Sequence, residues 1–204
     1  MAAKIRTKPR KTAVQERAKA TVDVILRATA RILVKEGYDR ASTNKIALAA
    51  GVSIGSLYQY FPSKEALVAA LLEQHVEEMA SVLRREYVRL AAMPLEQAIE
   101  DTVRLMVEAH SVDPKLHKVL AEQVPRIGKL DRVEALEREI AERVKESLRA
   151  RGGEINVKDL ELAAFIVVGM VESLTHVAVL ARPELLGDAF VREVSAAICR
   201  YLKG

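Results

Sequence analysis

Residues 43–61 read TNKIALAAGVSIGSLYQYF and form the most informative stretch of the chain. Apolar residues recur at helical spacing on both sides of Gly51, which predicts two helices of about two turns each. A glycine at the turn between them accepts a positive φ without steric cost. Two short helices joined by a glycine-containing turn are the pattern of a helix-turn-helix motif. The sequence therefore predicts such a motif here.

The second of these two helices has the composition of a helix that meets DNA. Ser53 is a good N-cap, which leaves the first backbone N–H groups of the helix available to anions. The exposed face is expected to carry small or polar residues that allow close approach to a groove and hydrogen bonds to bases or phosphates. An ordinary helical hairpin with a tyrosine-rich packing corner is the alternative. The residues of this face are Ile54, Gly55, Ser56, Gln59 and Tyr60.

The remainder of the chain also reads as helices, with no convincing strand pattern. An apolar stripe from Val22 to Leu33 ends at Gly37, and Ser63 is a good N-cap for a long helix to about Leu90. Pro94 and Pro114 stand where helices can begin. The pattern predicts further helices over 130–150, after a break at Pro125 and Gly128, over 157–180 with Asn156 as cap, and over 185–202. The expected fold is all-α, with roughly nine helices.

The distribution of charge along the chain separates a basic N-terminal region from a mildly acidic remainder. Half of the 204 residues are hydrophobic, so the chain can bury a core, and the single cysteine, Cys199, excludes a disulfide framework. Residues 1–64 hold 13 Lys and Arg against 4 Asp and Glu, whereas residues 65–204 hold 19 against 24. This predicts an N-terminal region that binds a polyanion, followed by a larger region with a different function. The expected domains are a mobile basic arm with the start of the first helix over 1–19, a helix-turn-helix domain over 20–64 and an effector-binding and dimerisation domain over 65–204. A plain solubilising tail is the alternative for the arm.

More than a dozen ordered positions between residues 20 and 72 resemble the N-terminal domain of TetR-family transcriptional regulators. Leu33 departs from the family pattern, which usually has an aromatic residue there, although leucine still fills a core position. The matching positions are Ile25, Leu26, Ala28, Gly37, Thr43, Ile46, Ala47, Ala50, Gly51, Val52, Ser53, Gly55, Leu57, Tyr58, Tyr60, Phe61, Lys64, Glu65, Ala66 and Leu67.

The resemblance implies a function and assigns roles to individual residues. The protein would be a sequence-specific DNA-binding regulator, a repressor released from its operator by a small, mostly apolar effector, with no enzymatic activity and no cofactor. Basic residues of the arm would enter the adjacent minor groove. The implied DNA contacts are Thr43, Tyr58, Tyr60 and Lys64 to phosphates, Ser53, Ile54, Gly55 and Ser56 at the groove, Gln59 to a base, and Arg6, Arg10 and Lys11 from the arm.

The apolar stretch over 160–181 is long enough to cross a membrane. Glu161, Glu172 and His176 within it argue against this, because each is costly in hydrocarbon. A core or a subunit interface is the better interpretation, and a soluble, cytoplasmic homodimer on a near-palindromic operator is expected. The family implies a four-helix bundle from two subunits, and a purely intramolecular core is the alternative. The expected interface residues are Ala163, Val167, Val171, Leu174, Phe190, Val194, Ile198 and Tyr201.

Polar residues inside apolar stretches are the candidates for sensing an effector. Each one is also explained by a structural role, since buried histidines are usually hydrogen-bonded and methionines usually fill gaps in a core. The expected pocket residues are Met79, Leu83, Met106, His110, Phe165, Met170, Glu172 and His176. No metal site is expected, because Pro114 interrupts the cluster of His110, Asp113 and His117.

Three other classes of protein compete with the regulator. An architectural DNA-binding protein without an effector shares the basic head. A helical enzyme could use Glu172 and His176, one turn apart, as an acid–base pair. A helical adaptor would use the apolar surfaces to bind another protein. No nucleophile–base arrangement or glycine-rich phosphate loop supports the enzyme, so the regulator is preferred.

Overall fold

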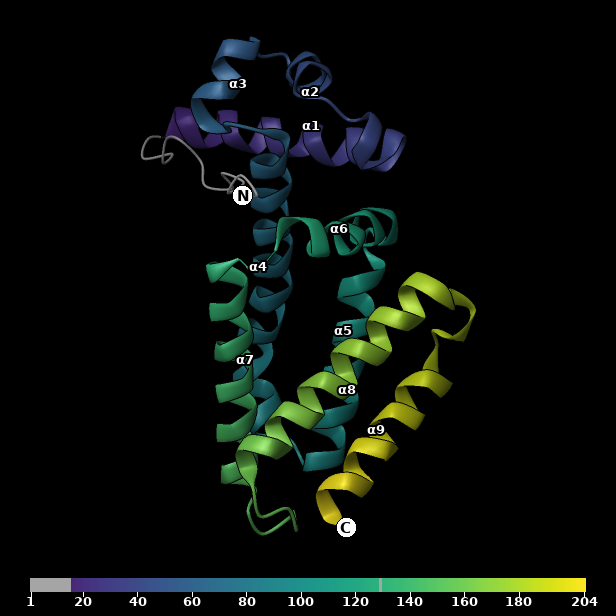
Figure 1. Ribbon diagram of the computed structural model, residues 1–204. Helices are drawn as coiled ribbons and strands as arrows, with labels where there is room; N and C mark the ends of the chain where they lie inside the picture. Colours follow the sequence, from purple (N-terminus) through teal and green to yellow (C-terminus); the bar gives the residue numbers. More distant parts are fainter. Residues whose placement is uncertain (1–15, 129) are drawn as a thin grey trace, which may run out of the picture. The chain divides into compact units, whose positions relative to one another are not determined.

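The computed structural model describes residues 16–128 and 130–204, and these form α-helices with no strand (Figure 1). The all-α prediction is confirmed. The helices of these residues are α1 Glu16–Arg40, α2 Thr43–Ala50, α3 Ile54–Tyr60, α4 Lys64–Ala91, α5 Leu95–Ser111, α6 Pro114–Ile127, α7 Asp131–Ala150, α8 Leu160–Ala181 and α9 Asp188–Lys203, with a 3-10 turn over Pro183–Leu185.

The chain divides into two compact units. The first contains residues up to His75 together with Lys115–Asp131, and therefore holds α1 to α3, the first turns of α4, and α6. The second contains Val76–Pro114 and Arg132–Gly204, with the rest of α4, α5 and α7 to α9.

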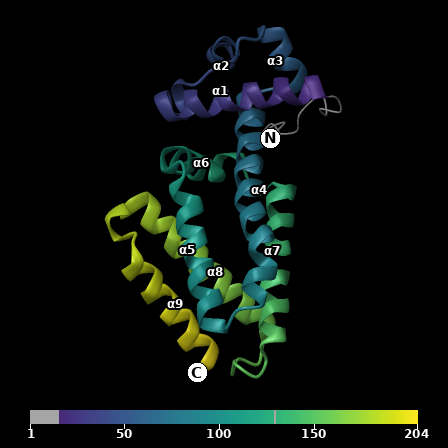
Figure 2. The ribbon, with the colours of Figure 1, turned by 180° about the vertical axis from the view of Figure 1, so that it is seen from behind.

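In the first unit, α2 and α3 pack beside α1 around a small apolar core, as Figures 1 and 2 both show. Gly37, at φ 76°, interrupts the last part of α1 at the predicted stop. Gly51, at φ 67°, ends α2 in the left-handed conformation, and its N–H donates to carbonyls of the last turn. The predicted turn between two short helices is therefore present. The largest buried side chains of this core are Ile25, Leu33, Ile46, Leu57, Phe61 and Leu67.

In the second unit, α5 packs against both α8 and α9, and Figure 2 shows these three helices together. Their core contains Val103 of α5, Ala163 and Val171 of α8, and Ile198 of α9. Arg151 is buried just after α7, and its guanidinium donates to the carbonyls of Leu90, Ala91 and Met93 at distances of 2.7 to 3.2 Å. It thus caps the C-terminus of α4 and the turn that follows it.

Three predicted helix boundaries differ from the structure. The backbone of α6 stays helical past Pro125, and Gly128, at φ 79°, follows its end. The N-cap of α8 is Asp159 rather than Asn156, whose side-chain amide donates to the carbonyl of Lys203. At the other end of α8, Pro183 opens a 3-10 turn, so α9 starts only at Asp188. Ser63 caps α4 as predicted, because its Oγ accepts from the Ala66 N–H at 3.2 Å.

Candidate nucleic-acid interface and ligand-sensing residues

The N-terminal half of α3 presents small side chains at an accessible helix end. The Ser53 hydroxyl accepts a hydrogen bond from the Ser56 N–H at 3.0 Å and lies 2.9 Å from the Ser56 hydroxyl. Ile54 is 38% exposed and Gly55 is also exposed, whereas Leu57 on the opposite face is fully buried. Gln59 is exposed and Tyr60 is half-buried. The structure therefore presents the predicted groove residues and the predicted base-reading residue on the surface of one short helix.

A hydrogen bond joins the start of α2 to α3. The hydroxyl oxygens of Thr43 and Tyr58 lie 3.0 Å apart, and either group can donate. Ser42 caps α2 by accepting from the Lys45 N–H. The bond brings together two residues that the sequence assigned separately to phosphate contacts, and it fixes the direction of the Tyr58 ring, which is 39% exposed.

Lys64 has a role inside the first unit. Its ammonium donates to the carbonyl of Tyr38 at 2.8 Å and to that of Ala41 at 3.2 Å. It also lies 4.0 Å from the centre of the Tyr38 ring, a cation–π contact. Lys64 therefore ties the start of α4 to the end of α1, and its contact with phosphate stays a prediction.

Two exposed residues at the start of α2 are not among the DNA contacts predicted from the sequence. Asn44 is exposed beside Thr43. The Lys45 ammonium lies 2.5 Å from a carboxylate oxygen of Glu36, and this hydrogen bond lowers the pKa of Glu36. The signal available in the sequence was the N-cap Ser42, which places both residues in the first turn of a helix next to Thr43. The predicted minor-groove residues Arg6, Arg10 and Lys11 lie outside the described part of the chain.

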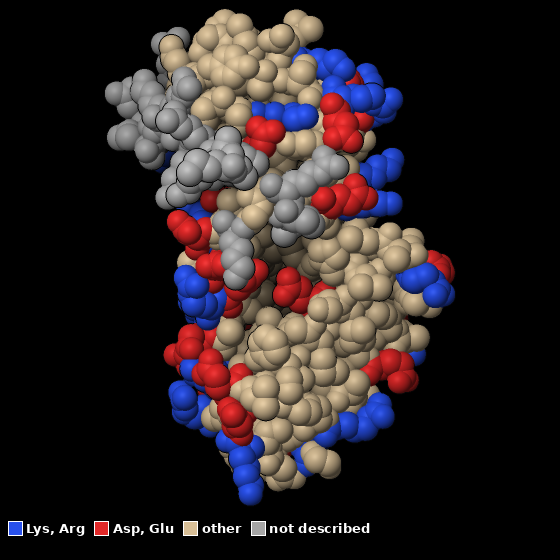
Figure 3. Space-filling model, viewed as in Figure 1, with Lys and Arg blue, Asp and Glu red and all other residues tan. Residues whose placement is uncertain are grey.

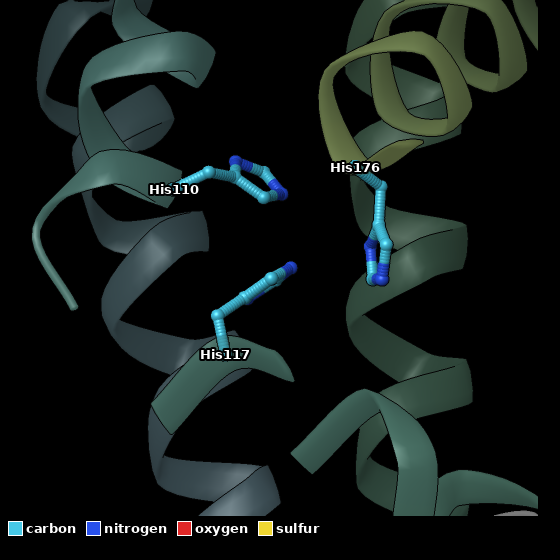
Figure 4. A group of neighbouring side chains, drawn as sticks. All are labelled: His110, His117 and His176. Carbon is cyan, nitrogen blue, oxygen red and sulfur yellow. The ribbon is translucent and has the colours of Figure 1, made fainter. Parts of the chain in front are cut away.

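In the second unit, His110 of α5 and His176 of α8 meet edge to face, with ring centroids 6.2 Å apart (Figure 4). His110 is buried, and its Nδ1 lies 2.7 Å from the carbonyl oxygen of Met106. Partial burial lowers the pKa of His176. Apolar surroundings also raise the pKa of the Glu172 carboxyl, although that side chain keeps contact with solvent. His117, also drawn in Figure 4, belongs to the first unit.

The other predicted pocket residues are dispersed. Met79 and Leu83 are half-buried on α4, and Met106 and Met170 pack against the core of the second unit. Phe165 is 73% exposed, and its place in an effector pocket stays a prediction. A shallow surface hollow of about 390 Å³ lies elsewhere in this unit. It is lined by Glu96, Glu100, Arg192, Ser195, Ala196, Cys199 and Arg200 of α5 and α9.

Four of the eight predicted interface residues face inward. Ala163, Val171, Val194 and Ile198 are buried in the core of the second unit, and their role at a subunit interface stays a prediction. Helical spacing identified apolar stripes without showing which stripe faces the core. Leu174 is 42% exposed, while Val167, Phe190 and Tyr201 are half-buried.

One side of α8 forms an exposed apolar face, which we call the α8 face. It includes Leu162, Phe165 and Val177, which are 52%, 73% and 59% exposed. Figure 3 shows mostly uncharged surface along this helix. Among the described residues, α8 is the one helix with the length and hydropathy of a membrane span, and a third of its apolar window is buried. Glu172 lies within that window, and its raised pKa marks the cost of charge in these surroundings.

Two family models match the chain. Residues 25–71 match the model described as bacterial regulatory proteins of the tetR family, and residues 94–202 match a tetracyclin repressor-like C-terminal domain. The first match covers the helix-turn-helix and its supporting helices. The second covers more than half of the chain, from the N-terminus of α5 to the end of α9.

Curated relatives and solved structures agree with these matches. The HTH-type transcriptional regulator YvkB of Bacillus subtilis is 41% identical over 61 residues, 30% of this chain and 32% of that protein. The nucleoid occlusion factor SlmA of Glaesserella parasuis is 33% identical over 93 residues, 44% of this chain and 45% of that protein. The chain thus spans less than half of the length of these relatives.

Among solved structures, the regulator FadR of Bacillus subtilis in complex with stearoyl-CoA superimposes with a TM-score of 0.69. It is 19% identical, and the match covers 88% of this chain and 98% of that one. At this identity the likeness shows the fold alone. Together with the family model over residues 94–202, these findings establish that the chain belongs to the TetR family of bacterial regulatory proteins.

Proposed function

We propose that this protein is a transcriptional regulator that binds a specific DNA sequence through α3. The observation that carries the proposal is the exposed N-terminal half of this helix. Ser53, Gly55 and Ser56 there leave the helix backbone accessible, and Gln59 supplies an amide on the same short helix. Small residues permit close approach to a groove, and an amide can read an adenine by two hydrogen bonds. The Thr43–Tyr58 hydrogen bond supports the same helix from α2.

The regulator acts as a homodimer on a near-palindromic operator. A helix as short as α3 reads few base pairs, so two copies are needed for a specific site, and a two-fold dimer matches a palindrome. The α8 face supports this proposal, because an exposed apolar face of this kind marks a protein interface on a soluble protein. A cytoplasmic location follows from the same function.

A small, mostly apolar effector binds in the second unit and releases the repressor from DNA. Such coupling is typically worth ~1–3 kcal/mol, which changes affinity ~5–150-fold. FadR of Bacillus subtilis, solved with stearoyl-CoA, supports a ligand with a long apolar chain for this fold. The remaining candidates for polar contacts are His110, Glu172 and His176. Stearoyl-CoA is therefore the first probe, and equal operator affinity with and without it would exclude acyl-CoA control of this kind.

Selection of binding sequences from random or genomic DNA tests the function. The selected site and a scrambled control are then titrated at one fixed salt concentration. We expect a near-palindromic site preferred by ~10³-fold or more. Uniform binding with a steep salt dependence would instead favour a nucleoid-associated role, which the similarity to SlmA makes the second candidate. Absence of binding at low salt would refute both.

Two substitutions separate base reading from backbone contact. Gln59→Ala should change the preferred base at one position of each half-site, with a cost of ~1–3 kcal/mol for the original site. Tyr58→Phe removes the hydroxyl that contacts both Thr43 and, as proposed, a phosphate, so it should weaken binding to all sequences equally. Tyr87→Phe, on the part of α4 in the second unit, is the matched control. If Gln59→Ala leaves the selected sequence unchanged, Gln59 does not read a base.

A further inference from the structure

Two helices far apart in the sequence bring a pair of histidines together in the second unit. A ring nitrogen of His110 on α5 and one of His176 on α8 lie within 4.8 Å of each other. Figure 4 shows the His110 ring extending from its helix toward the helix that carries His176. The 69° angle between the ring planes is not that of stacked rings. One imidazole nitrogen from α5 and one from α8 therefore lie close together, and the two helices pack against each other.

The hydrogen bond made by His110 determines which ring nitrogen carries the proton. A carbonyl oxygen only accepts hydrogen bonds, so the 2.7 Å contact with the Met106 carbonyl requires the proton of the neutral ring on Nδ1. Nε2 then carries the lone pair. Metal-binding histidines characteristically donate the N–H of the second ring nitrogen to a carbonyl or carboxylate, which fixes both tautomer and orientation. His110 is 2% exposed and already has this support.

The residues around the pair are suited to a cation. Thr175 precedes His176, is fully buried, and its hydroxyl oxygen has no hydrogen-bond partner among the described residues. Glu172 lies one helical turn before His176, and residues at this spacing share a face of a helix. Its carboxyl is exposed to solvent and is one turn of α8 away from the His176 ring. The pair therefore supplies two imidazole ligands, and Thr175 and Glu172 lie close to His176 along α8.

We propose that His110 and His176 bind one transition-metal ion of the zinc, cobalt or nickel class. Imidazole donors favour these ions over Mg²⁺ and Ca²⁺. Two nitrogens that each lie ~2.1 Å from a tetrahedral ion are ~3.4 Å apart, so modest ring rotations complete the geometry. Water or the Glu172 carboxylate fills the remaining positions. These residues are also the candidates for polar contacts with the proposed effector, so a bound metal ion would replace them in that role. The metal site does not depend on the proposed DNA binding through α3, so either of these two can fail without the other.

The second histidine pair of the chain fits a metal less well. In the first unit, Nε2 of His75 and Nδ1 of His117 lie 2.8 Å apart and share a hydrogen bond. Both of these nitrogens are engaged with each other, and their separation is shorter than the ~3.4 Å expected between two ligands of a tetrahedral ion. This pair is therefore not proposed as a metal site.

Titration of the full-length, untagged, chelator-treated protein with Co²⁺ tests the proposal. We expect one Co²⁺ per chain, with the visible absorption of a tetrahedral nitrogen-ligated ion that Zn²⁺ abolishes by displacement. His110→Gln and His176→Gln should each weaken Co²⁺ binding by at least the ~10–100-fold seen when even an outer-shell partner is lost. His75→Gln should bind as the wild type does. Helicity measured by circular dichroism identifies any variant that fails to fold.

The melting temperature with and without Zn²⁺ is a second measurement, which keeps the test valid if one variant folds poorly. Zn²⁺ binds only the folded protein at this site, so it should raise the melting temperature of the wild type and of His75→Gln, and leave that of the two site variants unchanged. Wild-type protein that neither takes up Co²⁺ nor gains thermal stability with Zn²⁺ would overturn the proposal. Undiminished binding in both site variants would overturn it as well, and so would loss of binding in His75→Gln alone.

Discussion

Gly51 and Gly55 lie four residues apart in the helix-turn-helix. We expect that replacing each with alanine changes the stability of the folded protein in opposite directions. Gly51 has φ +67° with open space around it, so Gly51→Ala is strained by conformation alone, by ~1–2 kcal/mol. Gly55 is inside α3, where an added Cβ meets only Ser53 Oγ, at 3.9 Å. Gly55→Ala should stabilise the helix by up to ~1 kcal/mol. Urea unfolding of both variants measures the difference, and a loss of stability in Gly55→Ala would contradict it.

The carboxyl of Glu172 predicts a pH dependence. Its folded-state pKa is raised above the ordinary value of 4.5, so the protonated form is favoured by folding. That stabilisation is complete below pH 4.5 and is lost as pH rises through the folded pKa. Glu172→Gln should therefore melt at a higher temperature than the wild type at pH 7, with the gap closing near pH 4. Glu193→Gln, at an exposed position on α9, is the control. A gap that stays constant with pH would refute the assignment.

The N-terminus of α8 is held by a side-chain N-cap, Asp159. The Asp159 carboxylate accepts from the Leu162 N–H at 3.0 Å, and loss of such a cap costs ~1 kcal/mol. Asp159→Ala should lower the free energy of unfolding by about this amount, while Asp159→Asn should keep most of it, because asparagine is an equally good N-cap. Chemical denaturation of the two variants decides. Equal losses would mean that the charge, rather than the capping hydrogen bond, is what matters.

The sequence predicted which segments are helical better than where helices begin or which face is buried. The helices on either side of Gly51 begin where apolar spacing and caps agree, and they were predicted closely. Asn156 and Asp159 are both acceptable caps, and only packing selects Asp159. In α8 nearly every residue is apolar, so spacing alone could not separate buried Ala163 from exposed Phe165.

The features of the candidate sites that depend on residues close in the sequence were predictable, and those that depend on tertiary contacts were not. The Ser53 cap and the exposed face of α3 follow from local sequence. The partners of Lys64 do not, because the carbonyls of Tyr38 and Ala41 come from more than 20 residues earlier in the chain. The pairing of His110 with His176 is also a tertiary contact, between α5 and α8, and no spacing rule in the sequence predicts it.

At the scale of the whole molecule, specific DNA binding depends on a second copy of the chain. If the α8 face is the subunit interface, Phe165→Asp places two charges in it, and charged groups buried without partners oppose association. We expect this variant to sediment as a monomer and to lose operator affinity by more than tenfold, although its DNA-binding unit is unchanged. Val88→Asp, at a position 77% exposed on α4, is the matched control and should stay dimeric. If Phe165→Asp sediments as a dimer, the interface lies on another surface. If it is monomeric yet binds the operator normally, one copy is sufficient for recognition.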